Sequence, residues 1–163
     1  MIRVFRISTS TVLVLLTVLL FLASTPFAVA QAQKTRAGSG DDDGPLFLEY
    51  RTVRIGMTTE EVRKKLNNPN DKSDEQDFFV FSDNESAQVF YDKSHKVFAI
   101  SVNFMNGARE LPTAKGVFGS DITPKPDGSI YKMVRYPKAG CWVSFSRTAG
   151  DSPLTTVTLQ KIE

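Results

Sequence analysis

The hydrophobic and polar positions of this 163-residue chain change their period several times, and each change predicts a different element. Residues 7–22 carry no charge and are mainly apolar, whereas residues 31–44 (QAQKTRAGSGDDDG) contain no bulky apolar side chain. From Pro45 the pattern becomes that of a folded chain, with a short apolar segment, a helical stretch and then alternating runs. The alternation predicts strands near 78–81, 87–91 and 97–104, separated by the turn-forming stretches SDNE and DKSHK.

The helical stretch carries its own start and stop signals. Thr58 is placed as the N-cap with a glutamate three residues on, which is a capping box, and Met57 can pack against Val62 as a hydrophobic staple. Val62 and Leu66 lie four residues apart and therefore share a face, with the basic residues between them turned outward. Pro69 stops the helix, because the residue before a proline is pushed out of the helical region.

The second half of the chain repeats this order of elements. Strand-like runs are expected near 130–136, 141–146 and 155–162, and a weak helical piece at 111–118 stands where the first helix stood. We interpret the order as two degenerate repeats, 45–106 and 107–163, each a helical piece plus a three-stranded meander. The alternative is that an α+β chain of this length shows such an order by chance. The predicted fold class is α+β, with helices packed on an antiparallel meander in one domain over 45–163.

The N-terminal pattern predicts export. Two arginines, the apolar run and the small-x-small motif at 28–30 fit a signal peptide over residues 1–30, cleaved before Gln31. Residues 31–44 would then form a flexible linker. A retained membrane anchor is the alternative, which the break at Pro26 and the cleavage motif oppose. In both cases we expect the rest of the chain outside the cytoplasm, in the periplasm or secreted.

Charge and cysteine content exclude some classes of protein. The chain has 20 basic and 18 acidic residues, and the two leader arginines account for the difference, so the domain has no electrostatic footprint for nucleic acid. Cys141 is the only cysteine, so no intramolecular disulfide can form and stability must come from an apolar core. We expect Cys141 to be buried; the alternatives are a reactive thiol or an intermolecular bridge.

The sequence contains no cluster typical of a catalytic or metal site. His95 is the only histidine and falls in a predicted hairpin turn, where a solvated ring is expected, and no Cys/His pairing has zinc-ligand spacing. The acidic run 41–43 lacks the turn glycine and distal glutamate of a calcium loop. One loop carries four carboxylates that we expect to be solvated: Asp71, Asp74, Glu75 and Asp77. We therefore predict a chain that is not an enzyme and has no cofactor and no metal.

The aromatic content points to protein binding. The first strand is apolar on both sides, since Phe78 and Val80 point to one face and Phe79 and Phe81 to the other. The second face therefore needs a partner, either another part of this chain or another protein. We favour an internal solution, in which the two meanders pack against each other and use most of the aromatic side chains. The residues predicted to contact a protein partner are Phe78, Val80, Phe90, Tyr91 and Trp142.

The stretch 54–69, RIGMTTEEVRKKLNNP, resembles the signature of the outer-membrane assembly factor BamE group, also called SmpA/OmlA. The same unit, sometimes doubled, is similar to the building block of beta-lactamase inhibitor proteins. An asparagine stands here where the group usually has a glycine before the proline. The matching positions are Ile55, Gly56, Met57, Thr58, Val62, Leu66 and Pro69. Folding explains all of these positions, so the resemblance assigns no partner-contact residue.

The resemblance implies a non-catalytic exported module that binds a protein in cell-envelope or outer-membrane assembly or maintenance. Members of the group look like lipoproteins, with a lipidated cysteine directly after the leader. Gln31 stands at that position, so we expect no lipid anchor on a cysteine and membrane association only through the partner. The alternative is a secreted enzyme-inhibitor-like or ligand-binding protein, which would have no envelope target.

Overall fold

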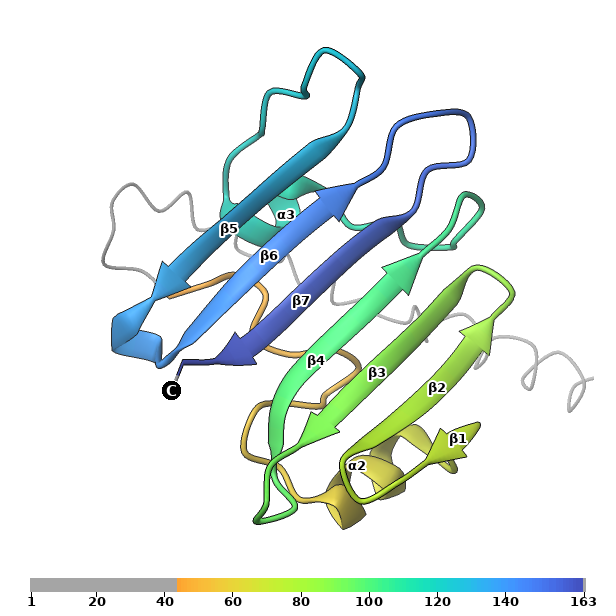
Figure 1. The fold of residues 1–163 in the computed structure, drawn as a ribbon, viewed down its shortest axis with the longest axis vertical. Coiled ribbons are helices and arrows are strands. Elements are labelled where there is room, and N and C mark those ends of the chain that lie inside the picture. Colours follow the sequence, from red (N-terminus) through yellow and green to blue (C-terminus); the bar gives the residue numbers. More distant parts are fainter. Residues whose placement is uncertain (1–43, 163) are drawn as a thin grey trace, which may run out of the picture. The chain divides into compact units, whose positions relative to one another are not determined.

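The structure is a computed structural model that describes residues 44–162. These residues form an α+β fold in which seven strands make one sheet, accompanied by short helices (Figure 1). The elements in chain order are α2 (Thr59–Leu66), β1 (Asp71–Lys72), β2 (Gln76–Ser82), β3 (Glu85–Tyr91), β4 (Val97–Phe104), α3 (Ala114–Phe118), β5 (Ile130–Tyr136), the 3-10 turn η1 (Pro137–Ala139), β6 (Cys141–Arg147) and β7 (Thr155–Lys161). The predicted leader and residues 31–43 of the predicted linker lie outside the described residues.

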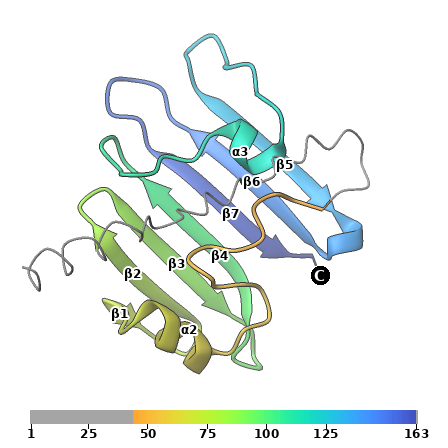
Figure 2. The same ribbon diagram turned by 180° about the vertical axis from the view of Figure 1, so that it is seen from behind.

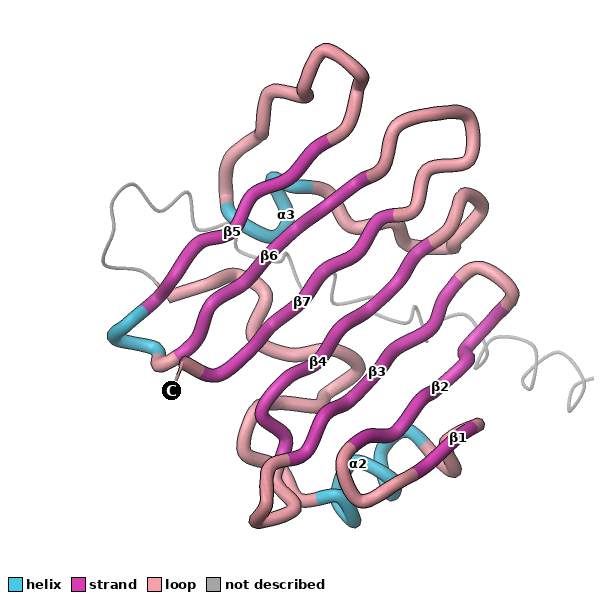
Figure 3. The backbone as a smooth tube through the Cα atoms, viewed as in Figure 1, coloured by secondary structure: helices cyan, strands magenta, loops and turns pink. Residues whose placement is uncertain are grey.

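The two halves of the chain meet within a single sheet. Its strand order is β1-β2-β3-β4-β7-β6-β5, and every neighbouring pair is antiparallel (Figure 3). The expectation that the two meanders pack against each other face to face is therefore wrong. They lie edge to edge because β4 and β7 pair with matched apolar residues, Ile100 with Leu159 and Val102 with Val157. This pairing turns the apolar residues of both halves toward the same side.

The alternating runs form strands where the sequence predicted them. β4 and β5 begin and end as expected, and the other long strands differ only at their ends; β2, for example, begins at Gln76. The two-residue strand β1 was not predicted, since two residues carry no periodic pattern. Alternation therefore located every long strand, and the hydrogen-bonded ladders determined the ends.

One face of the sheet carries the apolar core. Its buried residues alternate along the strands, as at Phe79, Val89, Ile100, Val143 and Val157. Both helices and the segment 45–58, which we call the strap, lie over this face (Figure 2). We call it the covered face and the opposite side the open face.

The strap is fixed to the sheet by buried residues and by backbone hydrogen bonds. Tyr50 and Val53 are buried, and their backbone N–H and C=O groups bond to each other. Gly56 N donates to the Val97 carbonyl, and Val97 N donates to the Met57 carbonyl, at 2.8 Å each. Gly56 has a φ of 88°, a conformation that glycine adopts without strain, and this turn leads the chain into α2.

The capping signals of α2 are confirmed. Thr58 Oγ1 accepts from Glu61 N at 3.3 Å, and Thr58 N donates to the Glu61 carboxylate at 2.8 Å. The helix ends at Leu66, since Asn67 has a φ of 67° and leaves the helical region. Val62 and Leu66 are both buried, so the spacing of four residues places the apolar face toward the sheet.

The second helical piece is shorter than predicted, covering Ala114–Phe118 and not 111–118. Thr113 has extended backbone angles, and its side chain accepts from Gly116 N at 3.0 Å, so the helix begins only after it. Gly119, with a φ of 77°, ends the helix.

The strands β1 and β5 form the two edges of the described sheet. Beyond the short β1, Asn70 Oδ1 accepts from Val80 N at 2.7 Å and so satisfies a backbone donor of β2. On β5, the ammonium of Lys132 lies 5.1 Å from the centre of the Phe118 ring, a cation–π contact with α3. A polar side chain thus occupies part of the β2 edge, whereas the charged side chain of Lys132 on β5 is turned toward α3.

An ion pair between the half-buried Arg63 and the buried Asp77 joins α2 to the sheet. Asp77 is 0% exposed and accepts from Arg63 Nε at 2.9 Å, from Arg63 Nη2 at 2.8 Å and from the Tyr91 hydroxyl at 2.8 Å. The prediction that the carboxylates of loop 71–77 are solvated is therefore wrong for Asp77, although Asp71, Asp74 and Glu75 are exposed. Asp77 is the second residue of β2, and strand alternation points its side chain toward the covered face, beneath α2.

Replacing Arg63 should destabilise the fold, because the buried Asp77 carboxylate would lose its counter-charge. We expect Arg63→Ala to lower the free energy of unfolding by about 3 kcal/mol, measured by urea denaturation. Lys64→Ala, at an exposed neighbouring position, is the control and should cost less than about 0.5 kcal/mol. Adding Asp77→Asn to Arg63→Ala should restore part of the loss. Equal stabilities of Arg63→Ala and Lys64→Ala would contradict a structural role for the ion pair.

Two buried tyrosines predict a loss of stability at high pH. Burial is the main reason that the pKa values of Tyr50 and Tyr91 lie above the usual 10.0. Hydrogen bonds from Tyr50 to Glu85 and from Tyr91 to Asp77 raise them further. Above pH 10 the unfolded chain has released protons that the folded chain keeps, so stability is full below pH 10 and falls as pH rises. We expect each tyrosine to contribute about 1.4 kcal/mol per pH unit to this decline.

The test is urea denaturation of the wild type and of Tyr91→Phe between about pH 9 and pH 11.5, the range in which an ordinary tyrosine titrates. The variant should lose stability less steeply than the wild type. Parallel curves would show that Tyr91 has the same pKa in the folded and unfolded chains.

Candidate functional site

On the open face, three cross-strand rows of side chains run across the six long strands, and Asp71 of β1, which pairs with Phe78, lies beside them. Each row takes one residue from β2, β3, β4, β7, β6 and β5 in that order, because directly paired residues point to the same side. The first row is Val80, Ser86, Asn103, Thr156, Ser146 and Tyr131. The second is Phe78, Gln88, Ser101, Thr158, Ser144 and Met133. The third is Gln76, Phe90, Ala99, Gln160, Trp142 and Arg135.

The rows are almost uncharged. Arg135, at the β5 edge, is the only charged residue among them, and the central strands contribute mainly hydroxyl and amide side chains. Some of these groups hold one another in place: Thr156 Oγ1 donates to Asn103 Oδ1 at 2.8 Å, and the hydroxyls of Ser101 and Thr158 are 3.2 Å apart. The centre of the open face is thus a neutral hydrogen-bonding surface whose orientation is partly fixed.

Apolar side chains lie on both sides of this polar centre. Val80 on β2 is 47% exposed, and on β5 Tyr131 is 58% and Met133 47% exposed. Phe90 packs against Phe98 with ring centres 6.2 Å apart at 49°, which holds one aromatic platform in place. Aromatic and large apolar groups of this kind are the usual anchors of protein interfaces.

A cavity of about 330 Å³ lies at the corner of the open face, next to the β2–β3 turn. Phe78 and Val80 of the rows line it together with Met105 and Leu154, which follow β4 and precede β7. Ser82, Asp83, Asn84 and Glu85 of the turn line it as well. The cavity therefore extends the open face with a hollow that is mainly apolar and has carboxylates beside it.

The structure places four of the five predicted partner-contact residues on the open face. Phe78, Val80, Phe90 and Trp142 come from β2, β3 and β6 and share this side of the sheet. Tyr91 does not join them. It is buried on the covered face, where its hydroxyl donates to Asp77. Because strand residues alternate, the neighbours Phe90 and Tyr91 point to opposite sides.

The residues of the family-like motif lie on the covered side and serve folding. Gly56 makes the turn before α2, Thr58 caps it, and Val62 and Leu66 pack under it. Ile55 and Met57 are partly buried against the core, and Pro69 follows the helix. Their placement agrees with the structural explanation of the motif and leaves the open face as the candidate site.

Among the described residues, the side chains that could bind a metal or take part in catalysis do not form a cluster. His95 is exposed in the β3–β4 turn with a φ of 55°. Within residues 44–162, no group of His, Cys, Asp and Glu side chains is arranged to hold a metal ion. Cys141 is buried, as predicted, and burial raises the pKa of its thiol, which disfavours the reactive thiolate. No helix of the described part is long and apolar enough to cross a membrane.

The hydroxyl and amide residues of the open face escape motif-based prediction, since serine, threonine and glutamine carry no fixed spacing. A signal is nevertheless present in β7, whose sequence TTVTLQK alternates buried Val157 and Leu159 with Thr156, Thr158 and Gln160. Which strands lie beside β7 depends on long-range pairing. The surface as a whole therefore emerges only from the assembled sheet.

Comparison of the chain with protein-family models, with curated proteins and with solved structures gives no match, so its own geometry has to carry the functional conclusion.

Proposed function

We propose that this chain is an exported, non-catalytic module that binds a protein partner of the cell envelope on the open face of its sheet. The observation that carries the proposal is the composition of that face: a neutral hydroxyl and amide centre between exposed apolar side chains. A surface of this kind favours burial against another polypeptide, because few charges have to be desolvated.

The anchors would lie on the two sides of the polar centre. Phe78 and Val80 stand beside the corner cavity, and Trp142 stands in the third row beside Arg135. A partner spanning the face would bury aromatic anchors at both sides and meet hydroxyl and amide groups between them. The cavity would receive one protruding side chain of that partner.

The resemblance of residues 54–69 to the BamE, or SmpA/OmlA, group supports a role in envelope or outer-membrane assembly or maintenance. The mirrored strand order, β2-β3-β4 against β7-β6-β5, is compatible with two tandem repeats over 45–106 and 107–163, as in inhibitor proteins. Since Gln31 stands where the group has a lipidated cysteine, membrane association would come only through the partner.

Loss of an anchor should abolish capture of the partner. The full chain, expressed with its leader so that natural processing occurs, is used to capture proteins from a solubilised envelope fraction. Phe78→Ala and Trp142→Ala should each reduce recovery of the specific partner at least about tenfold. Leu111→Ala, an exposed position outside the three rows, is the control and should bind as the wild type does.

Circular dichroism and thermal unfolding establish that each variant is folded. An envelope protein recovered equally by all four chains would exclude the open face as its binding surface. Recovery of only a soluble secreted protein, lost in the same two variants, would favour the inhibitor-like alternative over an envelope role.

Binding should depend little on salt, because Arg135 is the only charged residue in the three rows and only Asp71, Asp83 and Glu85 add charges beside them. We expect the Kd to change less than about threefold between 50 and 500 mM NaCl, since screening acts on charge–charge attraction. Surface plasmon resonance at several salt concentrations measures this directly. A tenfold or greater weakening would place the binding surface on a charged part of the molecule.

A further inference from the structure

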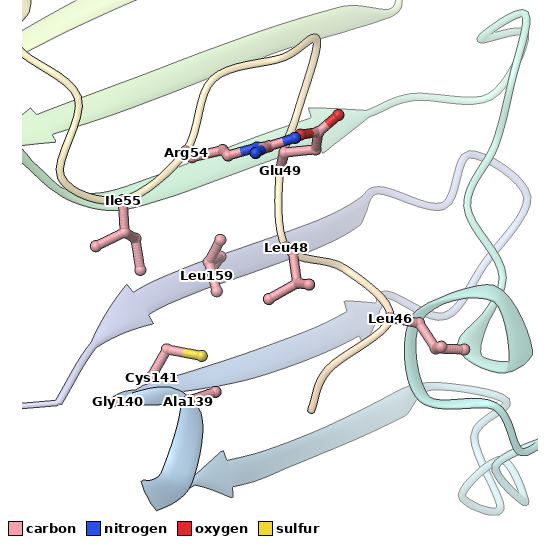
Figure 4. A pocket seen from close by; sticks show the side chains of 9 residues that line it. All are labelled: Leu46, Leu48, Glu49, Arg54, Ile55, Ala139, Gly140, Cys141 and Leu159. Atoms are coloured by element: carbon pink, nitrogen blue, oxygen red, sulfur yellow. The ribbon is translucent and has the colours of Figure 1, made fainter. Parts of the chain in front are cut away.

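A second cavity lies on the covered face, between the strap and strands β6 and β7 (Figure 4). Its volume is about 660 Å³, within the usual range of small-molecule sites. Leu46, Leu48 and Ile55 of the strap line one side, and Cys141 and Leu159 of the strands line the other. The strap therefore crosses this part of the sheet without packing fully onto it.

The exposure of the lining residues is unequal. Leu46 is 54% and Leu48 52% exposed, although both belong to a segment that lies over the core. Across the cavity Leu159 is only 1% and Cys141 3% exposed. An apolar ligand between the strap and the sheet would remove both strap leucines from water, which the side chains of residues 44–162 do not achieve.

The chemistry of the cavity favours an aliphatic ligand. Among the described residues that line it, none is aromatic, so a flat ring would find no stacking partner. The aliphatic side chains follow one another along the strap, from Leu46 beside α3 to Ile55 (Figure 4). An extended, flexible ligand matches this arrangement better than a compact one.

The charged groups at the cavity neutralise each other. Glu49 and Arg54, both of the strap, form an ion pair and lie together at one side of the cavity (Figure 4). A ligand with a full charge of either sign would have to compete with this pair. A neutral polar head can hydrogen-bond to the carboxylate or the guanidinium without breaking it.

We propose that the cavity between the strap and β6–β7 binds an unbranched alkyl chain that carries a neutral polar head. The chain lies along Leu46, Leu48 and Ile55 over Leu159, and the head lies beside Glu49 and Arg54. This site contains no residue of the three open-face rows, so a test of ligand binding here does not depend on whether the open face binds a protein.

Methyl NMR of the full chain, expressed with its leader and carrying ¹³C-labelled leucine methyls, tests the site with 1-decanol as the probe. The methyl signals of Leu46, Leu48 and Leu159 should shift and saturate together as 1-decanol is added. Leu111 is a partly exposed leucine away from both cavities and serves as the internal control. Its signal should not move.

A variant separates the site from general apolar association. Leu48→Asp places a charge in the cavity at a half-exposed position, so the fold should survive, and the affinity for 1-decanol should fall at least tenfold. Leu111→Asp is the matched control and should leave the affinity unchanged. Decanoate, the charged counterpart of the probe, should bind the wild type more weakly than 1-decanol.

Absence of any shift at Leu46, Leu48 and Leu159 up to the solubility limit of 1-decanol would overturn the proposal. So would a shift of equal size at Leu111, or an affinity that Leu48→Asp does not change. Tighter binding of decanoate would overturn the assignment of a neutral head.

Discussion

The pairing of β4 with β7 is the constraint on which the rest of the structure depends. It is the only contact between the two meanders within the described sheet, and it joins residues that are far apart in the chain. The register places Ile100 opposite Leu159 and Val102 opposite Val157, so the apolar residues of both halves form one continuous layer. A shift of one residue would turn the apolar side of one meander toward solvent.

This single layer determines how the two sides of the sheet differ. On the covered face, α2, α3 and the strap supply the second apolar layer that an isolated sheet lacks. On the open face, the same alternation leaves hydroxyl and amide groups on the central strands and apolar groups toward the edges. Each meander alternates in this way by itself, and the β4–β7 pairing joins the two into one covered and one open face.

Features determined by neighbouring residues could be predicted from the sequence. The cap at Thr58, the shared face of Val62 and Leu66, and the alternation in β2 to β7 depend on a few residues each, and the structure agrees with them. Phe78 and Val80 likewise could be assigned to one face, because strand alternation is local. The assignment of Tyr91 to the same surface as Phe90 ignored this rule, and the structure separates them.

Features that require distant partners could not be predicted. Asp77 looked like a solvated loop carboxylate because its partners, Arg63 and Tyr91, lie 14 residues away on either side. The edge-to-edge meeting of the meanders depends on β4 and β7, whose paired residues are more than 50 positions apart. The cavity under the strap depends on how tightly 45–49 approaches β6 and β7, and no sequence pattern encodes that distance.

The edges of the sheet bear on how the molecule can assemble. At one edge Asn70 already occupies a donor of β2, so that position is closed to a further backbone. At the other, Lys132 and Arg135 lie on opposite sides of β5, and a second copy of β5 alongside would bring like charges together. A copy added as a further strand would therefore have to displace Asn70 at one edge, and in the registers that place these cations opposite each other it would meet repulsion at the other edge.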